Sequence, residues 1–448
     1  MNSISVRPPA KPSFASSVVI STMGCKVNAF ESEMIAEKLE RNAIQRVQSV
    51  EDADLFIINT CTVTAEADRQ ARQLIRRAIR QNPRARIVVT GCYAQMDPDA
   101  CAQIPGVDLV VGNSQKLDIP ALVEDLCRDR LPPVLLRDID REISLPEQLL
   151  KGYQGKSRAF VQIQQGCDQG CTFCIIHVAR GPSRSFPPAS VRRQCERLLI
   201  NGYGEIVLCG VDVGSYGADI QDSEVDLAGL IRALANLEGD YRIRLSSIDP
   251  AHITDELVEL LRQSGNICPH LHLSLQSANT LILKRMKRRA RRSLVYDRIT
   301  ALRSAIPELV LSADILAGFP TESDAHFEDT LTAIEELEIA YPHVFTYSSR
   351  PGTPAARIPD QVPKSVRQQR ANAARRAGRK VWRRVARRQV GQTKRVLLEH
   401  CQISAHRRDL LFARADNYFP VQIKCDSRPE SPWLNVTITG VGTDTLLA

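Results

Sequence analysis

The sequence contains no apolar run long enough to cross a membrane, which argues against a helical membrane protein. A spanning helix needs about 20 consecutive apolar residues, whereas the hydrophobic residues, 43% of the 448, are spread over shorter runs. Near the N-terminus, Arg7 and Lys11 are not followed by the apolar core of a signal peptide. We therefore expect a cytoplasmic protein with no membrane partner.

Acidic residues are missing from one long stretch, residues 361–398, in which Lys and Arg recur throughout. Within it, four basic residues follow one another at helical spacing: Arg376, Lys380, Arg384 and Arg388. A solvated helix face is the ordinary explanation of such a run. Because the stretch offers no acidic partner for an internal ion pair, we favour a polyanion as the binding partner. A second basic block at 284–292 and the net charge of +8 point the same way.

We expect no disulfides, although the chain contains 13 cysteines. Cytosolic thiols stay reduced, so this many cysteines indicate metal or redox chemistry. The length exceeds what a single hydrophobic core supports, and we expect two or three domains.

Three cysteines, Cys167, Cys171 and Cys174, stand at CxxxCxxC spacing, and a glycine before each of the first two lets the backbone turn tightly. Thiolates on so short a loop can hold three irons of a [4Fe–4S] cluster and leave the fourth iron open for a reaction. Zinc is the competing metal. A structural zinc site needs a fourth protein ligand, for which His177 is the candidate. The spacing favours the cluster, and it resembles the radical S-adenosylmethionine (SAM) enzymes.

The N-terminal third repeats one plan three times: an apolar strand, a cysteine and then a helix. The cysteines are Cys25, Cys61 and Cys92. This order predicts a parallel α/β layout. Because ligands collect at the carboxyl ends of parallel strands, we expect the three thiols to converge and hold a second cluster. Cys101 and Cys127 are expected to be inert packing residues.

The segments around these cysteines resemble the three signatures of the methylthiotransferase family: GCKVN at 24–28, NTCTVT at 59–64 and TGCYAQ at 90–95. The resemblance covers nearly the whole chain. It implies that Cys25, Cys61 and Cys92 hold an auxiliary [4Fe–4S] cluster that carries or donates sulfur. It also implies a sulfur source and a reducing electron donor, which the sequence does not identify. His177 stands where the family commonly has proline, and we interpret it as a loop residue.

The central part alternates strands and helices, which suggests a partial (β/α) barrel with its chemistry at the carboxyl ends of the strands. Polar or glycine-rich segments follow several of these strands. By resemblance to the family, these segments line the SAM pocket. The residues assigned to SAM binding are Gly210, Asp212, Ser274, Gln276, Asp314 and Gly318.

The C-terminal residues form short β-rich runs separated by turns, which fits a small antiparallel barrel. It resembles a TRAM domain, an RNA-binding barrel. Tyr418 is a candidate for stacking on an RNA base, with packing inside the barrel as the alternative. Together with Tyr418, the basic row of Arg376, Lys380, Arg384 and Arg388 would contact RNA.

The expected organisation runs from an N-terminal tail to this barrel. The ranges are a disordered tail (1–16), an α/β domain with the auxiliary cluster (17–130), a linker (131–152), a radical SAM domain that ends in a basic helix (153–385) and the TRAM-like barrel (391–448).

Segments 204–217 and 244–250, together with GCKVN, resemble the threonylcarbamoyladenosine-tRNA methylthiotransferases. This implies an enzyme that converts N6-threonylcarbamoyladenosine next to the anticodon into its 2-methylthio derivative. One SAM would supply the methyl group, and a second would be cleaved to a radical that takes hydrogen from adenine C2. The alternatives are the same chemistry on isopentenyladenosine tRNA or on a ribosomal-protein aspartate. A non-catalytic, zinc-stabilised RNA-binding protein is the alternative from another class.

Overall fold

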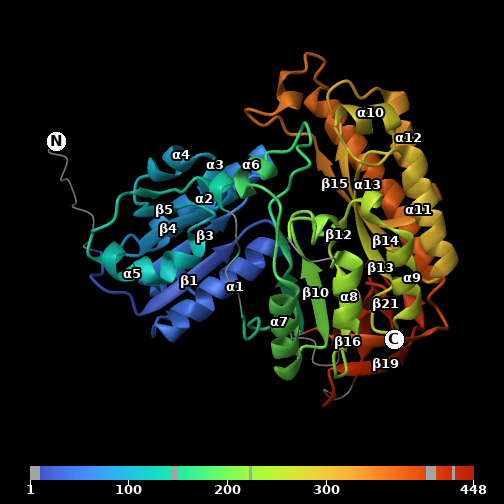
Figure 1. Cartoon of the computed structure of the whole chain (residues 1–448), viewed down its shortest axis with the longest axis horizontal. Coiled ribbons are helices and arrows are strands. Elements are labelled where there is room, and N and C mark those ends of the chain that lie inside the picture. Colours follow the sequence, from blue (N-terminus) through green and yellow to red (C-terminus); the bar gives the residue numbers. More distant parts are fainter. Residues whose placement is uncertain (1–10, 143–144, 146–148, 221–224, 400–409, 426–428) are drawn as a thin grey trace. The chain divides into compact units, whose positions relative to one another are not determined.

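The computed structural model describes residues 11–142, 145, 149–220, 225–399, 410–425 and 429–448. Of the expected tail and linker, residues 1–10, 143–144 and 146–148 lie outside this description. The chain divides into two compact units (Figure 1). The first comprises Met1–Leu150, Gln165–Asp168 and Cys174–Arg184, and the second comprises Lys151–Gln164, Gln169–Phe173 and Ser185–Ala448. In the described part of the chain, no helix has the length and apolar character needed to cross a membrane.

The first unit is a parallel sheet of six strands with helices on both faces, as the strand–cysteine–helix order predicts. The strand order is β2-β1-β3-β4-β5-β6, and every pair is parallel. The strands are β1 (Ser17–Thr22), β2 (Gln45–Arg46), β3 (Leu55–Thr60), β4 (Arg86–Gly91), β5 (Leu109–Val111) and β6 (Val134–Leu135). The helices are α1 (Lys26–Arg41), α2 (Ala65–Gln81), α3 (Cys92–Met96), α4 (Pro98–Ala102), α5 (Ile119–Cys127) and α6 (Ile176–Arg180).

Side chains of the central strands point alternately to the two faces of the sheet and form one hydrophobic core on each face. In β3, Phe56 and Ile58 pack with Ile75 of α2, whereas Leu55 and Ile57 pack on the opposite face with helices α1 and α5. Successive strand residues point to opposite faces, so a strand that is apolar throughout is covered on both sides. The carboxyl ends of β1, β3 and β4 therefore meet at one edge of a rigid sheet.

The second unit begins with a curved parallel sheet whose strands follow one another in chain order. Strands β7, β10 and β11 pair in one ladder, and β12, β13, β14 and β15 pair in the next. A single residue separates β11 from β12, so the two ladders continue into each other. This is the partial barrel expected from the βα alternation. The strands are β7 (Arg158–Gln162), β10 (Glu205–Cys209), β11 (Arg242–Leu245), β12 (Ser247–Ile248), β13 (His270–Gln276), β14 (Val310–Ala317) and β15 (Ile339–Thr346).

Helices lie between these strands, and a long basic helix follows the last of them. The helices are α7 (Pro188–Ile200), α8 (Leu227–Ala235), α9 (Asp255–Gln263), α10 (Thr280–Arg285), α11 (Arg292–Ala305), α12 (Asp324–Glu336) and α13 (Lys364–Arg387). Helix α13 lies against β15 and α12. It comes very close to β15 at Gly378, where a Cβ atom would lie 2.2 Å from Pro342 Cγ.

The C-terminal sheet belongs to the same unit as the barrel. Its strands are β16 (Thr393–Leu398), β17 (Leu410–Ala415), β18 (Pro420–Lys424), β19 (Trp433–Thr437), β20 (Gly440–Val441) and β21 (Leu446–Leu447). The order is β19-β16-β17-β18-β21-β20. The expected antiparallel pairing is present except between β18 and β21, which run parallel.

Two contacts dock this sheet against the barrel. A Cβ atom at Gly204 would lie 2.7 Å from the Trp433 ring. Arg242 Nη2 donates a hydrogen bond to the backbone oxygen of Arg414 at 2.9 Å. The C-terminal sheet is therefore packed on the barrel as part of one compact unit.

Candidate active site

The structure brings Cys25, Cys61 and Cys92 to the carboxyl edge of the first sheet. Cys25 precedes α1, Cys61 follows β3, and Cys92 is the first residue of α3 after β4. Gly24 adopts φ +91°, and a Cβ atom there would lie 2.8 Å from Cys61 Sγ, so the turn passes directly against this thiol. Burial, and to a smaller extent the neighbouring Cys92 and Cys25, raise the pKa of Cys61 to about 11. The three thiols thus share one electrostatic environment.

The ligand type at this edge suits an iron–sulfur cluster, because thiolates are the usual protein ligands of such clusters. A structural zinc site needs four protein ligands. Elsewhere in the described part of the chain, His272, Asp314 and His343 have ligand atoms that lie within 4.8 Å of one another.

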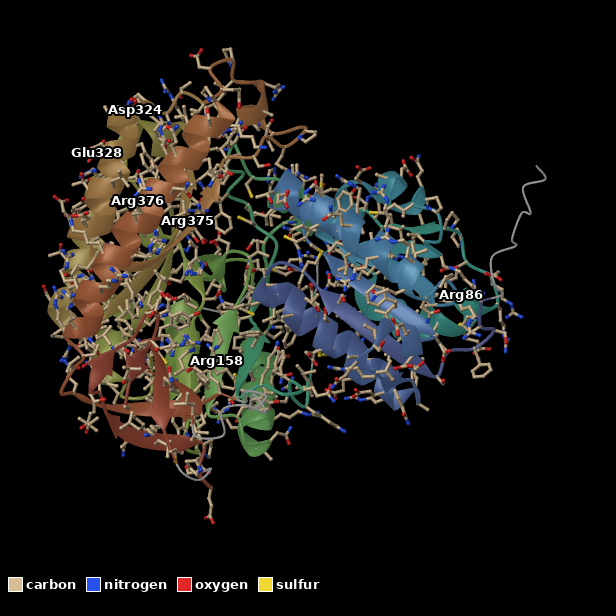
Figure 2. All side chains as sticks on the ribbon, turned by 180° about the vertical axis from the view of Figure 1, so that it is seen from behind. Arg86, Arg158, Asp324, Glu328, Arg375 and Arg376 are labelled. Carbon is tan, nitrogen blue, oxygen red and sulfur yellow. The ribbon has the colours of Figure 1, made fainter. Side chains whose placement is uncertain are left out.

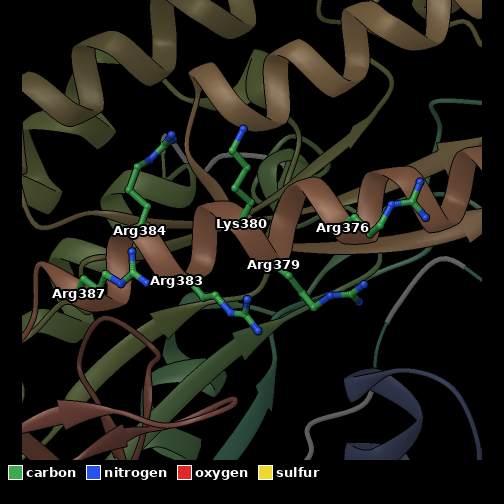
Figure 3. Close-up of a pocket in the computed structure, with 6 residues that line it drawn as sticks. All are labelled: Arg376, Arg379, Lys380, Arg383, Arg384 and Arg387. Atoms are coloured by element: carbon green, nitrogen blue, oxygen red, sulfur yellow. The ribbon is translucent and has the colours of Figure 1, made fainter.

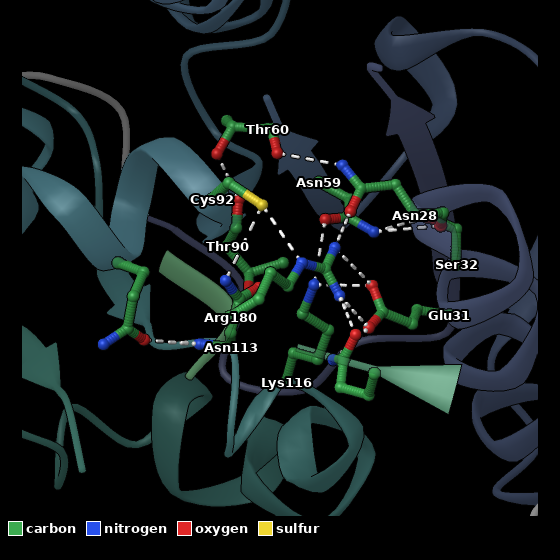
Figure 4. Close-up of polar contacts among 12 residues, drawn as sticks. Asn28, Glu31, Ser32, Asn59, Thr60, Thr90, Cys92, Asn113, Lys116 and Arg180 are labelled. Carbon is green, nitrogen blue, oxygen red and sulfur yellow. Dashed lines mark hydrogen bonds and ion pairs between the residues drawn. The ribbon is translucent and has the colours of Figure 1, made fainter. Parts of the chain in front are cut away.

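A buried charge network lies against the Cys92 thiol (Figure 4). Arg180, at the end of α6, donates from Nε to Cys92 Sγ at 3.2 Å and from Nη1 to Glu31 Oε1 at 2.5 Å. Lys116 Nζ donates to Glu31 Oε2 at 2.7 Å. Arg180 also donates to Asn28. Burial would lower the pKa of Arg180, but Cys92 and Glu31 raise it well above its ordinary value, so the side chain stays charged.

The CxxxCxxC loop is held by backbone contacts in both units. In the first unit, the Cys167 amide donates to the Gly181 oxygen at 3.1 Å, and a Cβ atom at Gly166 would lie 1.8 Å from the Pro182 oxygen. His177 lies in the short helix α6 rather than in a loop.

In the second unit, an arginine of the basic block 284–292 reaches this loop. Arg288 Nη1 lies 3.5 Å from Cys171 Sγ, and its Nη2 donates to Asp249 at 2.7 Å. The neighbouring Thr172 amide donates to the Met286 oxygen at 3.1 Å. The sequence indicated this block only as a general anion-binding feature, so the place of Arg288 beside a cysteine was missed.

The six residues assigned to SAM binding lie in the carboxyl-terminal parts of the barrel strands or directly after them. Gly210 follows β10, and a Cβ atom there would lie 2.9 Å from Gln164 Oε1, which also accepts hydrogen bonds from the amides of residues 211 and 212. Asp212 pairs with Arg289 at 2.9 Å. Ser274 and Gln276 lie at the end of β13, and Gln276 has φ +69°.

The remaining two residues come from β14 and the turn after it. Gly318 follows the strand with φ +78°, and its amide donates to Glu322 at 2.8 Å. Asp314 instead lies within the strand, where its carboxylate is 3.2 Å from His272 Nε2. The His272 ring is in turn supported at Nδ1 by the Ser312 hydroxyl at 2.8 Å. In the pairing of β13 with β14, Leu273 is opposite Ala313 and Gln276 is opposite Ile315, so Asp314 lies level with the stretch between them that contains Ser274.

The basic row chosen from the sequence is largely ion-paired, which corrects the expectation that it lacks internal partners. Lys380 contacts Glu335 of α12 at 3.1 Å, and Arg384 and Arg388 contact Glu338 at 3.2 and 2.5 Å. These acids come from α12 and the turn after it, some 45 residues before the basic row. The absence of acids within 361–398 therefore did not mean an absence of partners.

A neighbouring row on the same helix is exposed and unpaired. Arg379, Arg383 and Arg387 follow one another at i, i+4 spacing and have no ion pair or side-chain hydrogen bond within the described residues. With Arg376, Lys380 and Arg384 they line one shallow groove. Figure 3 shows Lys380 and Arg384 projecting to one side of α13 and Arg379 and Arg383 to the other.

Tyr418 lies where the C-terminal sheet meets the barrel. Its ring stacks on His270 with centroids 4.4 Å apart, and it meets Tyr341 edge-on at 5.6 Å. The guanidinium groups of Arg244 and Arg414 lie 5.2 and 4.8 Å from the ring centroid. These contacts are those of the packing alternative, and the base-stacking role of Tyr418 stays a prediction.

Comparison with known proteins first defines the class. A family model described as "Radical SAM superfamily" matches residues 161–334, and one described as "Uncharacterized protein family UPF0004" matches residues 17–112, the range that contains the first cysteine trio. The fold of the radical SAM methyltransferase TsrM from Kitasatospora setae is similar, with a TM-score of 0.56, 14% identity and 77% of each chain covered. The chain is a radical SAM protein with an added cysteine-bearing α/β unit.

Relatives with assigned functions define the family more closely. The chain is 42% identical to the threonylcarbamoyladenosine tRNA methylthiotransferase MtaB of Rickettsia prowazekii, over 90% of this chain and 92% of the relative. It is 33% identical to the tRNA-2-methylthio-N(6)-dimethylallyladenosine synthase of Staphylococcus aureus, over 79% of this chain and 69% of the relative. The chain belongs to the MtaB family of radical SAM methylthiotransferases, which confirms the resemblance drawn from the three cysteine signatures.

Proposed function

We propose that this protein converts N6-threonylcarbamoyladenosine next to the anticodon of tRNA into its 2-methylthio derivative. The observation that carries the proposal is the convergence of Cys25, Cys61 and Cys92 at one sheet edge, in a chain that also has a radical SAM barrel. A radical SAM enzyme that only abstracts hydrogen has no need of this second trio. Sulfur insertion requires a second centre to supply the sulfur. The higher identity to the Rickettsia relative supports threonylcarbamoyladenosine over the dimethylallyl substrate.

The donor sets fit two [4Fe–4S] clusters. Cys167, Cys171 and Cys174 would hold the one that binds SAM, and the trio at the first sheet would hold the auxiliary one. Thiolates are the ordinary protein ligands of such a cluster, and a set of three leaves the fourth iron open. When bound, the clusters and SAM supply the radical that takes hydrogen from adenine C2 and the sulfur that replaces it.

The residues of the chain itself bind and orient the reactants. Gly210 leaves room for a flat group beside the backbone after β10, and Asp212, fixed by Arg289, presents a carboxylate suited to hydroxyl groups such as those of a ribose. Ser274, Gln276, Asp314 and Gly318 complete the proposed SAM pocket. A C–H bond on an aromatic ring has no acidic proton, so these residues need no general base among them.

The enzyme also needs partners outside the chain: tRNA, SAM, an electron donor and a sulfur source. We propose that it works in the cytoplasm, where tRNA is modified. The proposed organisation keeps the auxiliary cluster in residues 17–130, the SAM chemistry in 153–385 and an RNA-binding role for 391–448.

The test is the reaction itself. The protein is reconstituted anaerobically with iron and sulfide and incubated with SAM, a chemical reductant and either threonylcarbamoyladenosine tRNA or isopentenyladenosine tRNA. Nucleosides are then analysed by mass spectrometry. We expect replacement of one hydrogen by SCH3 on the first tRNA only. Modification of the second tRNA alone, or of a ribosomal protein, would assign the chemistry to another substrate, and a colourless zinc protein without activity would overturn the proposal.

For tRNA binding, we propose that the unpaired row Arg379, Arg383 and Arg387 acts with Arg376 on the phosphate backbone. Replacing the three arginines of the unpaired row by glutamine is expected to weaken tRNA binding in a sequence-independent way. Removing one arginine–phosphate interaction should reduce the slope of log affinity against log salt by about 0.7 to 0.9. A titration at several salt concentrations measures this slope.

The paired row provides the matched control, with the same charge removed from the same helix. Replacing Lys380, Arg384 and Arg388 by glutamine should change the salt slope less, because Glu335 and Glu338 already compensate part of their charge. Equal slope changes for the two triple variants would contradict the assignment of the unpaired row.

A further inference from the structure

The charge network beside Cys92 is larger than the fold requires. Arg180 and Lys116 are each 1% exposed, and Glu31 is 4% exposed. Burying charges costs several kcal/mol for each ion unless partners compensate. A parallel sheet of this kind can be covered with apolar side chains, as the rest of the sheet is. Three buried charges at one point of the edge therefore indicate a role tied to that point.

The network also brings a lasting positive charge to the Cys92 thiol. Arg180 and Lys116 share the single carboxylate of Glu31, which accepts from both. Burial lowers the pKa of Lys116, whereas the pKa of Arg180 is raised, so Arg180 is the cation that persists. Arg180 Nε turns toward Cys92 Sγ at 3.2 Å (Figure 4). A [4Fe–4S] cluster held by three thiolates carries about one net negative charge in its oxidised state. The buried guanidinium of Arg180 has the opposite sign to this charge.

The segment that carries Arg180 is tied to the same place by further contacts. Helix α6 packs against α3, which begins at Cys92. Asn113 Nδ2 donates to the Ala179 oxygen at 2.6 Å and lies 3.7 Å from Cys92 Sγ. Arg180 follows Cys174 by only six residues. The segment that leaves the CxxxCxxC loop thus delivers a cation to a thiol of the other trio.

We propose that Arg180 is a positioning residue for the auxiliary cluster. Held by Glu31 and Asn28, it fixes the Cys92 thiolate by a charge-assisted hydrogen bond and makes the cluster easier to reduce and harder to lose. This inference rests on the proposed function, because it requires that Cys25, Cys61 and Cys92 hold a cluster.

The experiment isolates the auxiliary cluster in the full-length chain. Cys167, Cys171 and Cys174 are all replaced by alanine, and the protein is reconstituted anaerobically. Iron and sulfide per chain, the midpoint potential from an EPR-monitored redox titration and the rate of iron loss to a chelator are then measured. None of these readouts requires turnover.

Arg180→Gln should shift the midpoint potential to more negative values and speed the loss of iron several-fold, because a cation and a hydrogen bond to sulfur are both removed. Arg180→Lys keeps the charge and should lie between this variant and the parent. Glu31→Gln removes the one negative charge and should shift the potential in the opposite, positive direction. Opposite shifts from two partners of the same ion pair are expected from electrostatic tuning and not from a merely structural contact.

Arg86→Gln is the matched control. Arg86 is also a buried arginine of the first unit, ion-paired to Asp108 and Asp129 at 3.2 and 2.6 Å. Arg86 (labelled in Figure 2) is the first residue of β4, whereas Cys92 follows the last residue of this strand. This variant should lower the stability but leave the potential unchanged.

Two results would overturn the inference. One is an unchanged potential and unchanged iron loss in Arg180→Gln, and the other is a shift in Arg86→Gln as large as in Arg180→Gln. If Arg180→Gln does not fold, the inference is tested by the shifts of the midpoint potential in Glu31→Gln and Arg180→Lys. If the parent variant, which keeps Cys25, Cys61 and Cys92, binds no iron at all, the proposed function itself fails. That result differs from a cluster that is bound but whose potential and iron loss do not change in Arg180→Gln.

Discussion

Replacing Cys25, Cys61 and Cys92 together by alanine is expected to halve the iron of the reconstituted protein, from about eight to about four per chain. Cleavage of SAM should persist, because the CxxxCxxC loop is intact, while formation of the methylthio product should fall below detection. The reverse triple variant of Cys167, Cys171 and Cys174 should also hold about four irons and lose SAM cleavage altogether. Iron and sulfide analysis, with chromatography of 5′-deoxyadenosine, measures both outcomes.

The chain supplies its own control in cysteines that the structure buries away from both trios. Burial raises the pKa of Cys101 to about 12 and that of Cys268 to about 11, so both remain protonated packing residues. Replacing them, together with Cys195, by alanine should leave about eight irons in place. A wild-type protein with only four irons, none of them lost in the Cys25, Cys61 and Cys92 variant, would leave a radical enzyme without a sulfur-inserting centre.

The second large effect is expected at Glu205, the first residue of β10. Its carboxylate is fully buried and accepts from Arg242 Nε and Arg244 Nε, each at 2.7 Å, while Arg158 lies 3.7 Å away (Figure 2 labels Arg158). Glu205→Gln leaves two buried guanidinium groups without their counter-charge. Breaking a buried ion pair from one side typically costs about 3–5 kcal/mol. Urea unfolding of the variant should show a loss of this order.

An exposed ion pair of similar geometry is the control for this variant. Glu259 and Arg262 lie 2.5 Å apart on the surface of α9, and both are about half exposed. Glu259→Gln should change the stability by less than about 1 kcal/mol, as exposed pairs do. A loss at Glu205 no larger than at Glu259 would mean that the buried arginines find other partners.

The same carboxylate predicts an acid limit to stability. Burial alone would raise the pKa of Glu205, but Arg244 and Arg242 more than offset it and hold the pKa far below its ordinary value. Because the folded pKa lies below the unfolded one, the stabilisation is complete above the unfolded pKa of about 4.3 and is lost as the pH falls toward the folded value. The wild type and Glu205→Gln should therefore converge in stability in strong acid.

Local periodicity predicted the elements well, because it reports which residues face a core. The strand–cysteine–helix order around Cys25, Cys61 and Cys92 predicted a parallel sheet, and a parallel sheet brings the carboxyl ends of its strands to one edge. The basic row on α13 shows the limit of the same reasoning. Its helical spacing was right, but its ion-pair partners, Glu335 and Glu338, come from a different part of the chain.

That side chains from distant segments meet could not be predicted from the sequence. Glu31, Lys116 and Arg180 stand 85 and 64 positions apart, and nothing in the spacing links them. Each alone is typical of a solvated surface residue, since buried charges are rare. Only the tertiary fold shows that they share one buried site. Arg288, hidden in a run of basic residues, was missed for the same reason.

The contacts between the C-terminal sheet and the barrel determine which segments can be exchanged between related proteins. Trp433 covers Gly204, Tyr418 stacks on His270, and Arg242 donates to the Arg414 backbone. A chain that ended before β16 would leave an apolar surface and buried donors open to water on the barrel. The C-terminal sheet is thus not a module that can be exchanged independently of the barrel. A chimera that borrows it from a relative should fold well only if the barrel positions beneath it are borrowed as well.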